Sequence, residues 1–175
     1  MVIQVDTREK ARVVAPILAG FERMGVQWLS HSLPFADYMS LDNPRLVIDR
    51  KHDLAEVCTN LSDVPKKDKQ GRVKRYADGT VQSEWKRMER ELSGAQQYGL
   101  RVIFLVEHGH DVRCLADVHK WVNPRLKESP MAMSGERLYR RMELLERKYG
   151  VRWEFCDRKS TARRIVELLG GGGGG

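Results

Sequence analysis

The chain has 175 residues, of which 41% are hydrophobic and 31% are charged. This length allows one sizeable hydrophobic core and excludes two comfortable ones, so we expect a single domain over residues 1–169. The net charge of +7 at pH 7 and the isoelectric point near 9.5 favour a polyanionic partner, although a basic surface is also common among proteins that bind no nucleic acid.

Neither a membrane span nor a secretion signal is indicated by the sequence. No segment approaches roughly 18 consecutive apolar residues, and the N-terminal residues lack the basic-then-apolar layout of a signal peptide. We therefore expect a cytoplasmic protein with no membrane contact. Three cysteines, Cys58, Cys114 and Cys156, lack any Cys-x-x-Cys spacing, which favours free thiols over a disulfide framework.

A short apolar strand over residues 2–5 ends beside two acidic residues, Asp6 and Glu9. Open α/β sheets place their sites at strand ends, but carboxylates also favour helix N-termini, so these two side chains either belong to a site or cap the next helix. That helix has apolar residues at three-to-four spacing and either begins near Pro16 or is kinked there. A second strand is predicted over residues 26–33.

The next segment predicts a β-hairpin that carries two carboxylates and one lysine. Residues 38–41 and 46–48 are the two strands, and residues 42–44 (Asp-Asn-Pro) form a three-residue loop between them. This register places Asp37 opposite Asp49.

Side chains alternate along a strand, so Asp49 and Lys51 share one face while Arg50 points to the other. Two carboxylates, from Asp37 and Asp49, can hold Mg²⁺ and leave its other positions to water and phosphate. Lys51 can then orient the attacking water or neutralise charge on the phosphate. The alternative is a surface hairpin with ordinary ion pairs.

After this hairpin the sequence predicts a helix and then a basic loop. An apolar face over residues 54–61 indicates a helix that Asp53 can cap. Residues 63–80 are predicted to be a mobile loop, which either contacts the DNA backbone or is a solvated insertion. Its candidate DNA-binding residues are Lys66, Lys67, Lys69, Arg72, Lys74 and Arg75.

The second half of the chain alternates helices with two strands. Residues 81–98 form the most regular amphipathic helix, on which Glu91, Gln96 and Gln97 are polar candidates for the site. Residues 101–107 form a continuous apolar run, as expected for a central strand buried on both faces. A later helix capped by Ser134, a strand over 151–156 and a final helix over 162–169 complete the pattern.

Together these elements predict an α/β fold with a mixed central sheet flanked by helices. His108, His110 and Cys114 follow the central strand and suggest zinc, but their spacing fits no standard zinc site, which favours a polar loop. Residues 170–175, all glycine, are expected to be a flexible tail.

Three motifs carry a resemblance to a known family. Residues 5–9 (Val-Asp-Thr-Arg-Glu), 33–38 (Leu-Pro-Phe-Ala-Asp-Tyr) and 48–51 (Ile-Asp-Arg-Lys) occur in the order and spacing found in XPF-type structure-specific endonucleases, a branch of the PD-(D/E)xK superfamily. The chain also resembles, more loosely, small stand-alone nucleases of phages and prophages, which implies the host cytoplasm as location. The resemblance implies a restriction-endonuclease-like fold and metal-dependent hydrolysis of DNA phosphodiester bonds at branched, fork or flap structures.

Carried over by position, the resemblance implies that Asp37 and Asp49 bind Mg²⁺, for which Mn²⁺ can substitute. Lys51 is then the water-orienting or charge-neutralising residue, and Asp6 and Glu9 are outer acidic residues of the same site.

This chain departs from the family at three positions. Ala36 replaces a glycine, Asp49 replaces the commoner glutamate, and Ala55 stands where the family has its last aspartate. Family members often pair through this domain, so a homodimer is possible. Two alternatives are a catalytically inactive module that binds junctions and a four-way-junction resolvase on the same fold.

Overall fold

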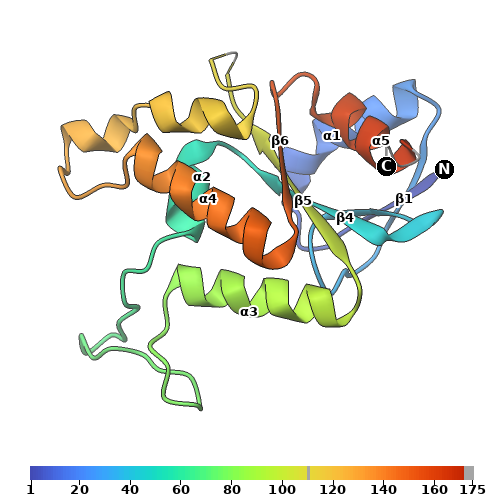
Figure 1. Cartoon of the computed structure of the whole chain (residues 1–175). Helices are drawn as coiled ribbons and strands as arrows, with labels where there is room; N and C mark the ends of the chain where they lie inside the picture. Colours follow the sequence, from blue (N-terminus) through green and yellow to red (C-terminus); the bar gives the residue numbers. More distant parts are fainter. Residues whose placement is uncertain (110, 172–175) are drawn as a thin grey trace.

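The computed structural model describes residues 1–109 and 111–171 and shows a mixed sheet with helices on both faces (Figure 1). The predicted α/β class is therefore confirmed. The elements, in chain order, are β1 (Val2–Val5), α1 (Ala11–Arg23), β2 (Gln27–Ser30), β3 (Tyr38–Ser40), β4 (Asn43–Lys51), α2 (Leu54–Asn60), α3 (Glu84–Gln97), β5 (Arg101–Glu107), two 3₁₀ helices (Leu115–Lys120 and Pro124–Lys127), α4 (Gly135–Tyr149), β6 (Arg152–Cys156) and α5 (Thr161–Gly170).

The sheet has six strands in the order β2-β1-β3-β4-β5-β6. Strand β3 runs antiparallel to both β1 and β4, whereas β1 pairs with β2, β4 with β5 and β5 with β6 in parallel. The run of apolar residues in β5 is buried on both faces as predicted, and β5 lies one strand from the sheet edge.

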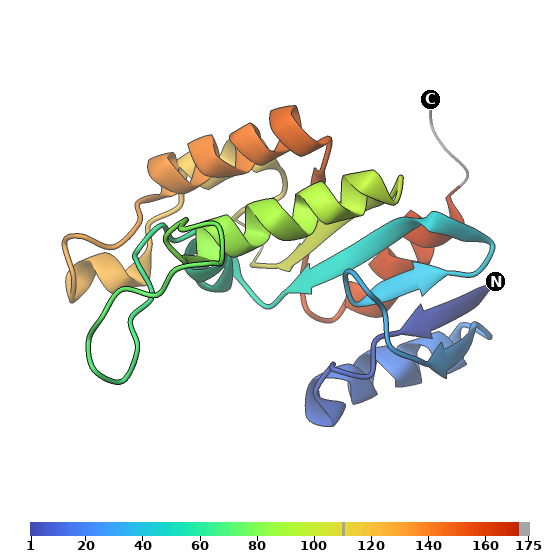
Figure 2. The same ribbon diagram turned by 90° about the horizontal axis from the view of Figure 1, so that it is seen from below.

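Alternating side chains of β5 divide the core into two halves. Val102, Phe104 and Val106 belong to the cluster beneath α2, α3 and α4, and Ile103 and Leu105 belong to the cluster beneath α1 and α5. Figure 2 shows α3 and α4 on one side of the sheet and α1 and α5 on the other. A residue of the neighbouring strand β4 therefore faces one helix layer or the other according to its position.

The predicted hairpin turn is wrong, but the predicted register beside the acidic residues is right. Ser40 pairs with Asn43, so the turn has two residues rather than three, and a register shift follows between Met39 and Ser40. The backbone N–H of Asp42 donates to Ser40 Oγ, a local bond that favours the tighter turn. Beyond the shift Tyr38 lies opposite Ile48.

Several predicted element limits also differ from the structure. Helix α1 begins at Ala11 and contains Pro16 in its interior, so the helix does not start at the proline. Gly170, assigned to a tail by the sequence, ends α5, while residues 172–175 and His110 lie outside the described residues. None of the described helices combines the length and apolar character needed to cross a bilayer.

Candidate active site

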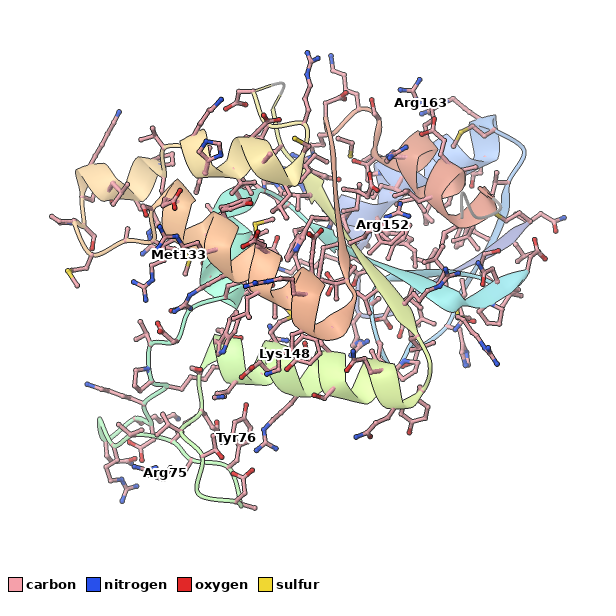
Figure 3. The ribbon with its side chains drawn as sticks, viewed as in Figure 1. Arg75, Tyr76, Met133, Lys148, Arg152 and Arg163 are labelled. Atoms are coloured by element: carbon pink, nitrogen blue, oxygen red, sulfur yellow. The ribbon has the colours of Figure 1, made fainter. Side chains whose placement is uncertain are left out.

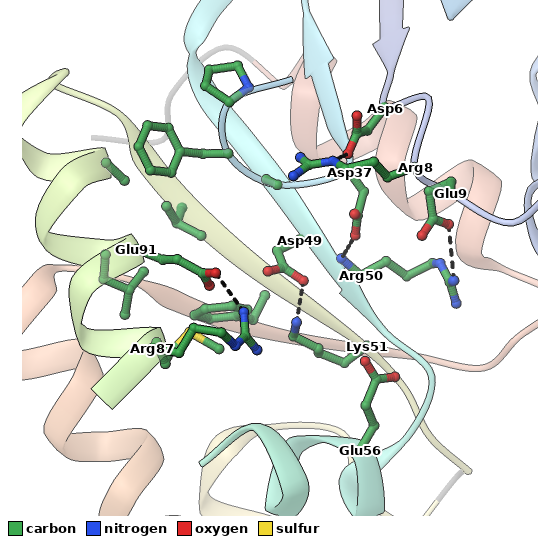
Figure 4. Close-up of a pocket in the computed structure, with 18 residues that line it drawn as sticks. Asp6, Arg8, Glu9, Asp37, Asp49, Arg50, Lys51, Glu56, Arg87 and Glu91 are labelled. Atoms are coloured by element: carbon green, nitrogen blue, oxygen red, sulfur yellow. Dashed lines mark hydrogen bonds and ion pairs between the residues drawn. The ribbon is translucent and has the colours of Figure 1, made fainter. Parts of the chain in front are cut away.

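A polar pocket of about 360 Å³ opens at the carboxyl end of β4, between β3, α2 and α3 (Figure 4). Its walls bring together the motif residues that are distant in the sequence. The lining residues are Asp6, Arg8, Glu9, Pro34, Phe35, Ala36, Asp37, Asp49, Arg50, Lys51, Glu56, Arg87, Met88, Glu91, Leu92, Ala95, Val102 and Phe104.

Asp49 and Lys51 lie on the same face of β4, as the alternation predicts. Lys51 Nζ is 2.6 Å from Asp49 Oδ1 and 5.5 Å from the centre of the Phe104 ring. Burial opposes the charge on Lys51, but the carboxylates of Asp49, Asp37 and Glu56 raise the pKa of its ammonium group. Lys51 is therefore a buried cation at neutral pH, held at the floor of the pocket.

Asp37, the residue that precedes β3, lines the same pocket. Its backbone N–H donates to Ile48 O over 2.9 Å, and its Oδ2 accepts a 2.7 Å hydrogen bond from the backbone N–H of Arg50. Burial, together with the charges of Asp49 and Glu9, raises the pKa of Asp37 to about 8, although the bond from Arg50 opposes this shift. A cation between Asp37 and Asp49 would remove this repulsion.

The raised pKa of Asp37 makes the stability of the metal-free protein depend on pH. Between about pH 4 and pH 8 the folded protein keeps a proton on Asp37 that the unfolded chain has lost, so the free energy of unfolding falls as pH rises through this window. We expect Asp37→Asn to be more stable than wild type at pH 8 in EDTA, and to lose this part of the pH dependence. Thermal melts from pH 5 to pH 9 measure the difference.

The exposed Asp42→Asn variant is the matched control and should keep the wild-type profile. Added Mg²⁺ should restore stability to wild type at pH 8, because a ligand that binds the folded state stabilises it. Parallel profiles for wild type and Asp37→Asn would contradict the electrostatic cause.

Asp6 and Glu9 line the pocket, but each is bound to other groups of the protein. Asp6 is buried, pairs with Arg8 at 2.5 Å and accepts a hydrogen bond from the backbone N–H of Leu33. Glu9 accepts bonds from Arg50 and from the Tyr38 hydroxyl, at 3.1 and 3.4 Å. The capping alternative is wrong, since α1 has Lys10 as its N-cap and no acidic residue in its first turn.

Arg50 points away from Asp49 and Lys51, as predicted, into the opposite helix layer. Its guanidinium lies 3.1 Å from Glu9 and 3.4 Å from Glu107, and its side chain is 7% exposed. Glu107 comes from the end of β5, and the sequence did not identify it as a partner of Arg50.

Ala36, one of the departures from the motifs that this chain resembles, occupies a left-handed backbone conformation with φ of 63°. A side chain in this conformation costs roughly 1 to 2 kcal/mol, while glycine adds entropy to the unfolded chain. We expect Ala36→Gly to raise the free energy of unfolding by up to about 1 kcal/mol, as measured by urea denaturation.

Ala55→Gly is the control with the opposite sign, because Ala55 lies within α2 and glycine there should cost roughly 0.5 to 1 kcal/mol. A loss of stability in both variants would show that the turn before Asp37 is not strained.

Glu56, which follows Ala55 in the sequence, lines the pocket. Glu56 Oε2 accepts a 2.8 Å bond from the backbone N–H of His52. Asp53 has a structural role, since its side chain caps α2 by accepting from the backbone N–H of Glu56, as predicted.

Helix α3 contributes Arg87 and Glu91 to the pocket wall (Figure 4). Arg87 pairs with Glu84 and with Glu91, each at 2.6 Å. Glu91 was a candidate, whereas Arg87 was not singled out, although its four-residue spacing from Glu91 is a sequence signal for one helix face. Gln96 instead contacts the Lys148 carbonyl on α4.

Asp37 and Asp49 are the side chains of the pocket that would hold a metal ion. Within residues 1–109 and 111–171, no three His, Cys, Asp or Glu side chains gather as a metal-binding group. Mg²⁺ is commonly held by one or two carboxylates together with water and phosphate, and Asp37 and Asp49 would supply these carboxylates.

The basic segment 63–80 is not an open loop. Isolated bridges join Lys67 to Val73 and Arg75 to Val81, so two short turns stand beside the N-terminus of α3. Figure 3 shows Arg75 and Tyr76 in this projecting segment.

Internal contacts engage half of the candidate DNA-binding side chains. Lys66 pairs with Glu84 on α3, Arg72 pairs with Asp68, and Arg75 donates to the Gly79 carbonyl. The other three candidates are exposed and have no ion-pair partner among the described residues: Lys67, Lys69 and Lys74.

The fold is similar to that of a solved structure, XPF from Aeropyrum pernix. The TM-score is 0.62 at 22% sequence identity, and the match covers 97% of this chain and 63% of the Aeropyrum chain. The likeness confirms the XPF and restriction-endonuclease-like fold that the motifs imply. The sequence matches no protein-family model and no curated protein sequence.

Proposed function

We propose that this protein is a metal-dependent endonuclease that hydrolyses DNA phosphodiester bonds at branched, fork or flap structures. The observation that carries the proposal is that Asp37, Asp49 and the buried Lys51 ammonium line one pocket, with Lys51 Nζ 2.6 Å from Asp49 Oδ1. The fold shared with an XPF protein supports the same chemistry and substrate class.

Each polar group of the pocket has a chemical use in this reaction. Mg²⁺ held by Asp37 and Asp49 would polarise a phosphate oxygen and lower the pKa of a water molecule. Lys51, oriented by Asp49, places a fixed positive charge where negative charge develops on the phosphate. Arg87, fixed by Glu84 and Glu91, supplies a second cation from the opposite wall.

The three exposed lysines of segment 63–80 are proposed to contact the DNA backbone. Changing Lys67, Lys69 and Lys74 to glutamine should weaken binding and reduce the salt dependence of log K by about 0.9 per lost contact with duplex phosphate. Binding titrations at several salt concentrations measure this slope. The matched control removes the same charge elsewhere, by changing Lys120, Lys127 and Lys159 to glutamine.

The function is tested by incubating labelled fork, flap, four-way and plain duplex DNA with Mg²⁺ or Mn²⁺, beside an Asp49→Ala control. Cleavage of the branched substrates by wild type alone is expected. Preferred cleavage of four-way DNA would favour the resolvase, and binding to forks without any cleavage would favour the inactive binding module. An Asp49→Ala protein that cuts as well as wild type would contradict the proposed site. Pairing of subunits stays a prediction, which the mass of the protein in solution tests.

A further inference from the structure

Helix α3 continues beyond Arg87 and Glu91, which line the pocket, toward a pair of aromatic rings. Positions 87, 91, 94 and 98 follow the three-to-four spacing of a single helix face. The first two are charged and line the pocket, the third is Gly94, and the fourth is Tyr98 at the C-cap. Tyr98 is 73% exposed.

Gly94 lets an aromatic ring from the other wall reach the helix. A β-carbon at this position would lie 3.0 Å from Phe35 Cζ, so the ring occupies the space that a side chain would need. The centres of the Phe35 and Tyr98 rings are 5.8 Å apart and the rings are tilted by 51°. This is the range in which aromatic rings attract one another.

The chain fixes this pair close to the candidate catalytic groups. Phe35 lines the pocket and precedes Asp37 by two residues, with the left-handed Ala36 between them. A phosphate beside Asp37 and Asp49 would therefore have an aromatic surface next to it, on the side away from the basic segment 63–80.

We propose that Phe35 and Tyr98 form a stacking site for one unpaired nucleobase of the strand that is cut. The inference rests on the proposed function only in taking DNA as the ligand of the pocket. Stacking on an aromatic ring tolerates every base, since each base has a π-face. A base inside a duplex is already stacked on its neighbours, so this site favours DNA with a single-stranded nucleotide beside the scissile phosphate.

The surroundings of the pair favour a nucleic acid over a protein partner. The adjoining pocket is lined by charged side chains, including Lys51 and Arg87, which are paired with carboxylates of the protein. The cores of protein interfaces, by contrast, are depleted of charged residues.

Binding of fluorescent fork DNA to the Asp49→Ala protein tests the site without cleavage. A series of forks is compared, each with a single abasic nucleotide at a different position of the unpaired arm. We expect one position to weaken binding about tenfold, a typical contribution of a single stacked base. Tyr98→Ala should weaken binding of intact DNA by a similar factor, and the abasic nucleotide should then have no further effect at that position.

Three further variants test whether the effect on DNA binding comes from this pair of rings. Tyr98→Phe should bind like the parent, and Gly94→Ala should weaken binding because it displaces the Phe35 ring. Trp28→Ala, which removes an aromatic residue that is 36% exposed on β2, should leave binding unchanged.

The stacking site is overturned if no single abasic position matters, or if Tyr98→Ala and the parent bind alike. It is also overturned if Tyr98→Ala changes the mass of the protein in solution while DNA binding stays the same, since the rings would then contact another protein copy. These outcomes are distinct from failure of the proposed function. A protein that binds forks through a stacked base but never cuts them would contradict the nuclease alone.

Discussion

Replacing Lys51 with methionine is expected to slow cleavage of a DNA fork by roughly 100- to 1,000-fold at saturating Mg²⁺, the usual effect of removing one preorganised charge from an active site. Lys51 is buried and its Nζ lies 2.6 Å from Asp49. A cation from the solvent therefore cannot take the position of the missing ammonium group. The reaction rate under single-turnover conditions is the appropriate measurement, because it reports the chemical step separately from DNA binding.

Two controls separate this loss from other effects of the substitution. Lys127→Met removes an exposed lysine from a 3₁₀ helix and should cleave at the wild-type rate. The melting temperature of Lys51→Met shows whether Asp49, left without its partner, has destabilised the fold. If Lys51→Met is folded and its cleavage rate lies within a few-fold of the wild-type rate, Lys51 has no catalytic role.

The position of the candidate catalytic residues on the sheet could be predicted because it depends on local rules. Alternation along β4 is enough to put Asp49 and Lys51 on one face and Arg50 on the other. The shape of the hairpin turn could not be predicted, because a side chain to backbone bond at Ser40 selects a two-residue turn with a bulge. The register near Asp37 agrees with the structure even though the predicted turn does not.

The partners of the acidic residues depend on contacts between distant parts of the chain. The sequence placed Asp6 at a strand end, but its bond to the backbone of Leu33 joins residues 27 positions apart. Arg87 was missed for the same reason, since it reaches the pocket only because α3 packs over the sheet. Local patterns therefore predicted which residues line the pocket. Tertiary packing determines which of their polar atoms form hydrogen bonds or ion pairs within the protein.

Replacing Arg50 with methionine is expected to lower the free energy of unfolding by roughly 3 to 5 kcal/mol, as when one partner of a buried ion pair is removed. Burial opposes the charge of Arg50, but Glu9, Tyr38 and Glu107 raise the pKa of the guanidinium, which stays charged. Glu107 is 6% exposed, and its other ion pair among the described residues is with Arg158 at 3.9 Å. Urea denaturation measures the loss, and Arg45→Met, an exposed position on the same strand, should change stability little.

The cause of this loss can be tested by removing the two carboxylates as well. If Arg50→Met is unstable because it leaves Glu9 and Glu107 without their cation, then adding Glu9→Gln and Glu107→Gln should recover most of the lost stability. Thr161 donates a 2.8 Å bond to Glu107, which glutamine can still accept. If the triple variant is no more stable than Arg50→Met, packing of the arginine side chain and not charge holds this layer together. Recovery would instead show that Arg50 is retained in β4 to balance the carboxylates that surround the pocket.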